Sequence, residues 1–116
     1  MATPSKPYNH ADQVTETNLQ AAVIELATWS KWLVHHSRPA RTNDGWRTAI
    51  QGHVGFPDLI MARGPRLIVA ELKRQGAKPT EAQQLWLDTI SAGGGLEVYV
   101  WRPADWLAGE VAEILR

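Results

Sequence analysis

The sequence predicts an α/β fold, a mixed β-sheet flanked by helices, with elements in the order α-β-β-β-α-β-α. Three observations support this class: an apolar stripe at helical spacing near the N-terminus, two short apolar runs joined by a tight turn, and a helix followed by a strand in the last third. At 116 residues, 44% of them hydrophobic, the chain is long enough for one modest core. We therefore expect a flexible polar arm at residues 1–11 and a single domain at residues 12–116.

A first helix is expected from about Asp12 or Thr15 to about His35. Its apolar residues recur every three or four positions, at Leu19, Val23, Leu26, Trp29 and Leu33. Residues 38–45 are polar, contain a proline and end in Asn-Asp-Gly, which predicts a loop. Residues 46–51 alternate in polarity and are expected to form the first strand.

The middle of the chain carries a hairpin signal. The apolar runs 59–62 and 67–70 flank the turn Arg63-Gly64-Pro65-Arg66. Because both runs are continuously apolar, both faces of these strands are expected to be covered. If the turn is centred between Gly64 and Pro65, residues whose numbers sum to 129 face each other across the hairpin.

The last third predicts a helix, a strand and a second helix. Residues 80–83 spell a capping box, and the helix that follows carries Leu85, Trp86 and Ile90 before stopping at three glycines, 93–95. A strand, a helix and a further strand in sequence imply a right-handed crossover within one sheet. The strand 96–101 should therefore lie parallel to the strand that holds Glu71. Pro103 suits the first turn of a last helix, expected to bury Leu107, Val111 and Ile114.

Composition excludes several classes of function. There is no cysteine, which excludes disulfides, thiolate zinc sites and cysteine nucleophiles and suits a reducing cytoplasm. No apolar run is long enough for a signal peptide or a membrane span. The net charge is zero, yet residues 31–79 hold nine basic and three acidic residues, a net +6. That segment either contacts a polyanion or forms an ordinary solvated surface.

Two carboxylates are expected to face each other across the hairpin, because the residue numbers of Asp58 and Glu71 sum to 129. Their Cβ atoms would lie roughly 5 Å apart. Lys73 would emerge on the same face, about 7 Å along the strand. Opposed carboxylates repel unless a cation lies between them, and oxygen-only ligation favours Mg²⁺ or Mn²⁺. Such a metal can polarise a phosphate and activate water, and Lys73 can stabilise the transition state.

A structural explanation stays open beside this chemical one. Asp58 could cap a turn, with Glu71 and Lys73 as charges at the end of a strand. The register decides between them, because a slip of one residue would put the two carboxylates on opposite faces of the sheet.

These residues resemble a known family. Gly55-Phe56-Pro57-Asp58, followed after twelve residues by Glu71-Leu72-Lys73, is similar to the PD-(D/E)XK nuclease motif. The chain more narrowly resembles the stand-alone VRR-NUC (virus-type replication-repair nuclease) proteins of phages and bacteria, over roughly residues 14–115. The further matching features are Glu16 with Gln20, Thr80-x-x-Gln83 before Trp86-Leu87, and Arg102-Pro103-x-Asp105.

The resemblance implies a restriction-endonuclease-like fold and a metal-dependent endodeoxyribonuclease. It implies that Asp58 and Glu71 bind Mg²⁺ or Mn²⁺, that the backbone carbonyl of Leu72 completes the metal shell, and that Lys73 assists the water. Gln83 would sit beside the centre, and Glu16 would approach from the first helix to serve a second metal. Small stand-alone members act as homodimers on branched DNA such as four-way junctions. We expect no organic cofactor, no membrane partner, and a cytoplasmic location in a bacterial or phage-infected cell.

The remaining candidates each have a structural alternative. Gln83 could simply close its capping box, and Glu16 could be a favourable charge in a first helical turn. His35 and His36 are expected at a helix end, where phosphate contact is their best functional role. The candidates for DNA contact are Arg38, Arg41, Arg47, His53 and Lys78. Competing functions are a non-catalytic nucleic-acid-binding module and a sequence-specific restriction-type nuclease.

Overall fold

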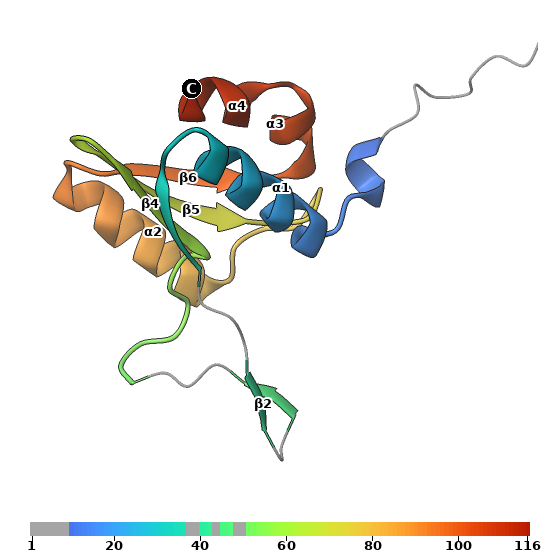
Figure 1. Cartoon of the computed structure of the whole chain (residues 1–116). Coiled ribbons are helices and arrows are strands. Elements are labelled where there is room, and N and C mark those ends of the chain that lie inside the picture. The colour runs from blue at the N-terminus through green and yellow to red at the C-terminus, as the bar shows by residue number, and fades with distance from the viewer. Residues whose placement is uncertain (1–9, 37–39, 43–44, 48–50) are drawn as a thin grey trace, which may run out of the picture.

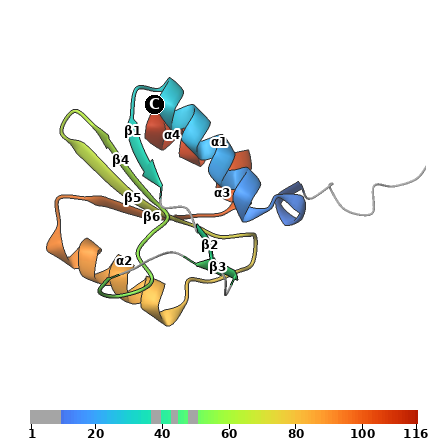
Figure 2. The same cartoon turned by 60° about the horizontal axis from the view of Figure 1, so that its bottom comes forward.

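The chain folds around a four-stranded mixed sheet with helices on both faces, as the sequence predicted. The computed structural model describes residues 10–36, 40–42, 45–47 and 51–116. The sheet has the order β1-β4-β5-β6, and these strands are Leu33–His36, Leu59–Arg63, Arg66–Leu72 and Glu97–Trp101. One face carries α1 (Glu16–Trp29), α3 (Pro103–Leu107) and α4 (Glu110–Leu115), and the other carries α2 (Glu81–Gly93) (Figure 2). A separate two-stranded sheet pairs β2 (Ala40–Thr42) with β3 (Gly45–Arg47) and lies apart from the main sheet (Figure 1).

The register of the central hairpin is the expected one. In the antiparallel pair β4–β5, Leu59 faces Ala70 and Arg63 faces Arg66, so every facing pair sums to 129. The parallel pairing of β5 with β6, in which Leu72 lies beside Trp101, is confirmed as well. Together these two pairings place the end of β5 between β4 and β6, at the centre of the sheet.

Alternation along β5 gives its residues two different surroundings. Ile68, Ala70 and Leu72 belong to the main apolar core, together with Leu19 and Val23 of α1. Residues between them point to the opposite face, the face that α2 covers. Residues 68–72 are all buried, which is why this strand is apolar on both sides except at Glu71.

The first helix is shorter than the sequence predicted, because it ends at Trp29 and not at His35. The chain reverses at Lys31, whose φ is 73°, and the next residues form β1 beside β4. Pairing in the sheet outweighs the helical periodicity of Leu33. The buried helical positions are Leu19, Val23 and Ala27, each four apart, whereas Trp29 is 84% exposed.

The segment between β1 and β4 also differs from expectation. Residues 40–42, expected in a loop, form β2 and pair with β3. The strand expected at residues 46–51 is instead β3, which ends at Arg47, while residues 48–50 lie outside the described part and Gln51 lies in a bend. The first strand of the main sheet is therefore β1. The predicted order of the core elements is correct, although the predicted location of its first strand is wrong.

His10–Gln13 form a short 3-10 helix, η1, in which Ala11 is buried. Residues 1–9 of the expected arm lie outside the described part of the chain.

The last helix is two helices, because Gly109 adopts a φ of 81° between them. Val111 is buried as expected and Ile114 is partly buried, but Leu107 is exposed. Pro103 does occupy the first turn of α3.

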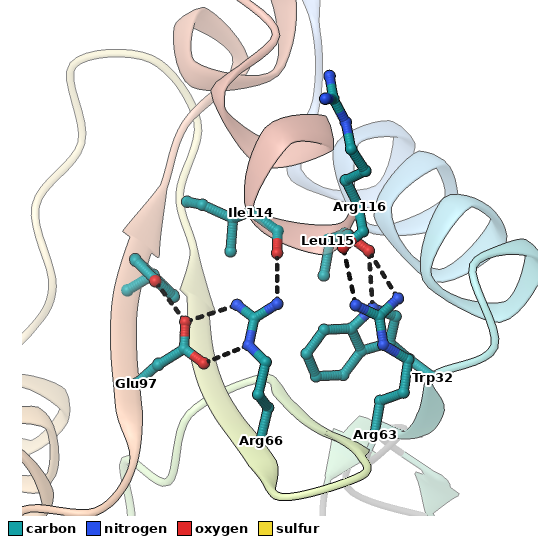
Figure 3. Close-up of polar contacts among 8 residues, drawn as sticks. Trp32, Arg63, Arg66, Glu97, Ile114, Leu115 and Arg116 are labelled. Carbon is teal, nitrogen blue, oxygen red and sulfur yellow. Dashed lines mark hydrogen bonds and ion pairs between the residues drawn. The ribbon is translucent and has the colours of Figure 1, made fainter.

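Two arginines of the β4–β5 turn hold the end of α4 (Figure 3). Arg63 donates to the carbonyls of Leu115 and Arg116, and Arg66 donates to that of Ile114. Both guanidinium groups also lie over the ring of buried Trp32, 4.5 and 4.9 Å from its centroid. The contacts supply partners for carbonyl groups that a helix leaves unpaired at its C-terminal end.

Candidate metal centre

Asp58 and Glu71 meet at one end of the β4–β5 hairpin. Asp58 directly precedes β4, and continuing the register by one pair beyond Leu59 and Ala70 brings it opposite Glu71. The carboxylate oxygen Oδ2 of Asp58 accepts a hydrogen bond of 2.8 Å from the backbone N–H of Leu72. Asp58 is thus fixed to the strand that carries Glu71, and the predicted proximity of the two carboxyl groups is confirmed.

Among the described residues, Glu71 is the charged residue that is buried, with 1% of its surface exposed. Its Oε2 atom is buried without a hydrogen-bond partner. Burial, a hydrogen bond with Asp58 and the negative charge of Asp58 raise the pKa of Glu71 from 4.5 to about 9. The positive charge of Lys73 opposes this rise in the pKa of Glu71, and the negative charge of Glu16 adds to it. Together these effects favour the protonated form of Glu71.

The residues present fit a hard divalent cation. A buried carboxyl oxygen without a partner, beside a second carboxylate, is an incomplete arrangement that a cation would complete. The carbonyl of Leu72 points to the same edge of β5 as its N–H group, toward Asp58. The donor set is therefore two carboxylates and one carbonyl, all oxygen. Within the described residues no three His, Cys, Asp or Glu side chains gather to hold a metal, so Glu16 does not complete a three-carboxylate group.

Lys73 directly follows the last residue of β5. Its backbone N–H donates to the carbonyl of Trp101 at 3.0 Å, so the strand geometry extends past Leu72. Residues two apart in a strand share a face, which puts Lys73 on the side of Glu71, as its effect on the pKa of Glu71 also indicates.

Glu16 and Gln83 are held by helix starts. Glu16 is the first residue of α1, after the N-cap Thr15, and it reaches the centre only through its charge. Gln83 closes the capping box of α2: its Oε1 accepts from the N–H of Thr80, and its own N–H donates to the Thr80 hydroxyl. The structural alternative for Gln83 is thus realised, and a catalytic role for it stays a prediction.

The predicted DNA contacts are only partly within the described chain. His53 and Lys78 are exposed, in the segments before β4 and before α2. Arg41 and Arg47 lie in β2 and β3, where only the backbone is described, and Arg38 lies outside the described residues.

The sequence prediction missed two features of this end of the molecule. His36 is not at a helix end: it lies in β1 opposite Leu59, and its Nε2 contacts the amide of Gln20 from α1. The β-branched Val34, two residues before His36, was the available strand signal. The second feature is the packing of residues 54–56 on α2, for which the glycine and proline around Phe56 were the available signal.

Comparison with protein-family models finds no match, and comparison with curated proteins finds none either. No helix in the described ranges combines the length and apolar character needed to cross a bilayer.

Proposed function

We propose that this protein is a divalent-metal-dependent endonuclease that hydrolyses phosphodiester bonds in DNA. The observation that carries the proposal is the buried Glu71 beside Asp58, with one carboxyl oxygen that has no partner. A protein that needed only stability would gain little from this pair, because burial of a polar group without a partner costs free energy. A metal-binding function explains why both carboxyl groups lie at one strand end.

Each residue of the centre has a distinct task in this proposal. Asp58 and Glu71 hold the cation, and the carbonyl of Leu72 adds a third oxygen. A bound Mg²⁺ or Mn²⁺ supplies Lewis-acid polarisation of the phosphate and lowers the pKa of water. Lys73 places its ammonium group beside the reacting phosphate and stabilises the negative charge that develops there.

The kind of substrate is part of the proposal. The ordered motif set, from Glu16 through Asp58 and Glu71-Leu72-Lys73 to Asp105, supports membership of the VRR-NUC group. On that basis we propose a homodimer that cuts branched DNA such as four-way junctions, in the cytoplasm of a bacterial or phage-infected cell. Two active sites related by a two-fold axis suit paired cuts in a symmetric junction. Basic residues between positions 31 and 79 are the candidates for phosphate contacts.

The test is cleavage of labelled four-way junction, flap, single-stranded and linear duplex DNA. Each substrate is incubated with Mg²⁺, Mn²⁺ or EDTA, and the wild type is compared with Asp58→Asn. We expect metal-dependent cutting of the junction by the wild type and no cutting by the variant, which retains junction binding. Equal turnover by the variant would remove Asp58 from the mechanism.

Two other outcomes would redirect the proposal. Junction binding that is equal with and without EDTA, with no cleavage of any substrate, would indicate a non-catalytic binding module. Cutting of one duplex sequence without preference for branches would indicate a sequence-specific enzyme.

A further inference from the structure

An aromatic ring is exposed beside the candidate metal centre. Phe56 is the single phenylalanine of the chain, and 42% of its surface is exposed. The following residue, Pro57, is buried. An apolar ring that the fold leaves partly uncovered, in a segment that is otherwise anchored, is available to a ligand.

The ring is held by α2. It packs edge-on against Trp86, with ring centroids 5.0 Å apart, and the indole N–H of Trp86 donates to the carbonyl of Val54 at 3.0 Å. Gly55 approaches Ala82 so closely that an added Cβ would lie 2.7 Å from the Ala82 carbonyl carbon. Residues 54–56 are therefore anchored to the helix at three successive positions.

The backbone of Phe56 is restricted as well. The ring of a proline disfavours helical backbone angles at the residue before it and favours extended ones. Pro57, which follows Phe56, is itself buried. The orientation of the ring is thus fixed before any ligand arrives, which lowers the entropy cost of binding.

The ring lies close to the metal centre along the chain. Phe56 precedes Asp58 by two residues, so their Cα atoms are at most about 7 Å apart. Both residues belong to the short segment that leads into β4. A base on this ring would therefore belong to a nucleotide near the phosphate held at the centre.

A basic loop leads into α2, the helix that holds the ring. Residues 73–80 carry Lys73, Arg74 and Lys78 and no acidic residue. This loop connects the end of β5 with the start of α2, the helix that anchors Gly55 through Ala82. Arg74 and Lys78 are exposed. An apolar ring on a helix whose preceding loop carries exposed cations matches the composition of a nucleotide, an apolar base face joined to a phosphate.

We infer that Phe56 is a stacking surface for an unpaired base of the DNA strand being cut. This inference rests on the proposed nuclease function and refines its substrate class. Inside a duplex each base is already stacked on both faces, so the ring favours DNA with unpaired nucleotides beside the scissile phosphate, as in single-stranded flaps and open branch points.

The test measures binding without cleavage. A fluorescein-labelled oligothymidylate and a blunt duplex of equal length are titrated in EDTA, and fluorescence anisotropy reports binding. The variants are Phe56→Leu, which keeps an apolar side chain but removes the aromatic face, and Phe56→Tyr, which keeps that face. The control is Leu85→Ala. Leu85 lies on α2, the helix that holds Phe56, and 66% of its surface is exposed. Thermal melting verifies that each variant is folded, and light scattering gives its oligomeric state.

We expect Phe56→Leu to weaken oligothymidylate binding by about five- to one-hundred-fold, the range for loss of one stacked base. Phe56→Tyr and Leu85→Ala should bind as the wild type does, and duplex binding should change little. Unchanged oligothymidylate binding by Phe56→Leu would overturn the inference, as would a change of oligomeric state, which would assign the ring to contact between two copies.

Binding and cleavage together distinguish failure of the stacking surface from failure of the nuclease. A wild-type protein that cleaves DNA with metal, but whose Phe56→Leu variant binds normally, retains the nuclease and loses the stacking surface. A wild-type protein that binds oligothymidylate through Phe56 but cuts no DNA with metal retains the stacking surface and loses the nuclease, and one that binds neither probe loses the stacking surface.

Discussion

Asp58 accepts a 2.8 Å hydrogen bond from the backbone N–H of Leu72, so a side chain that precedes β4 supplies the partner for the last residue of β5. The same carboxylate is therefore a candidate ligand and a structural acceptor. Asp58→Asn keeps an oxygen acceptor, whereas Asp58→Ala leaves this N–H without one.

The first prediction follows from that double role. Asp58→Ala should be less stable than Asp58→Asn by about 1–3 kcal/mol, the cost of a buried donor without a partner. Both variants should lose cleavage. Urea unfolding in EDTA measures the difference, and equal stabilities would show that the hydrogen bond contributes nothing to the fold.

The second prediction concerns the pH dependence of stability. The pKa of Glu71 is raised to about 9 by burial and by Asp58, while its ordinary value is 4.5. The folded protein therefore binds a proton that the unfolded chain releases, and stability in EDTA should fall as pH rises from about 4.5 to about 9. The slope from one such group is at most about 1.4 kcal/mol per pH unit.

Glu71→Gln is the matched control for this slope, because its amide does not titrate. Its melting temperature in EDTA should vary less over the same pH range than that of the wild type. Parallel curves for the two proteins would show that Glu71 titrates normally.

The third prediction separates Lys73 from its neighbour Arg74. Lys73→Ala should slow cleavage by about ten- to a thousand-fold, the range for loss of one transition-state contact, with little change in metal affinity. Arg74→Ala removes an exposed cation one residue later, a candidate phosphate contact, so it should weaken DNA binding but keep the single-turnover rate at saturating DNA to within a small factor. Single-turnover cleavage and metal titration measure the two effects. A Lys73→Ala rate equal to that of Arg74→Ala would make Lys73 a surface charge.

The fourth prediction compares two glycines with similar backbone angles. Gly52 has a φ of 98° and open space around it, while Gly55 has a φ of 95° and lies against Ala82. Alanine at either site carries backbone strain, but only Gly55→Ala adds a clash, worth about 1–3 kcal/mol. Gly55→Ala should thus be the less stable variant in urea unfolding and should cleave more slowly, because the clash displaces Asp58. Equal unfolding midpoints would mean that the segment moves freely on α2.

The fifth prediction concerns Arg66 and Glu97. Arg66 and Glu97 form a bidentate ion pair with N–O distances of 2.7 and 2.8 Å. The hydrogen bonds from Arg66 hold the pKa of Glu97 below its usual 4.5. The pair stabilises the fold above pH 4.5, and this stability is lost as pH falls through the lowered pKa. Both side chains are about a third exposed, so Glu97→Gln should cost about 1 kcal/mol or less at neutral pH. The difference from wild type should vanish in acid, and a difference that persists there would point to packing.

The sequence predicted the central hairpin well because its information is local. A short turn between two apolar runs fixes which residues face each other, so the positions of Asp58 and Glu71 followed from arithmetic on the chain. The capping box of α2 was equally local, with Thr80 and Gln83 three residues apart.

The errors occurred where distant partners decide the structure. Leu33 continues a helical stripe in the sequence, but β4 lies beside it in space and draws residues 33–36 into the sheet. The exposure of Leu107 likewise depends on distant partners, because α3 packs against η1 and α4 packs against α1. The anchoring of Phe56 joins residues 30 positions apart, which no short-range pattern reveals.

The arginine contacts at the β4–β5 turn have a consequence for misfolding. Arg63 and Arg66 face each other at one end of the hairpin, and Asp58 reaches Leu72 at the other. A shift of one residue between the strands would draw the guanidinium groups away from α4 and at the same time separate the two carboxyl groups. A chain paired in the wrong register would therefore lose the contacts that hold its last helix, so molecules in which Asp58 and Glu71 are separated would remain incompletely folded and open to proteolysis.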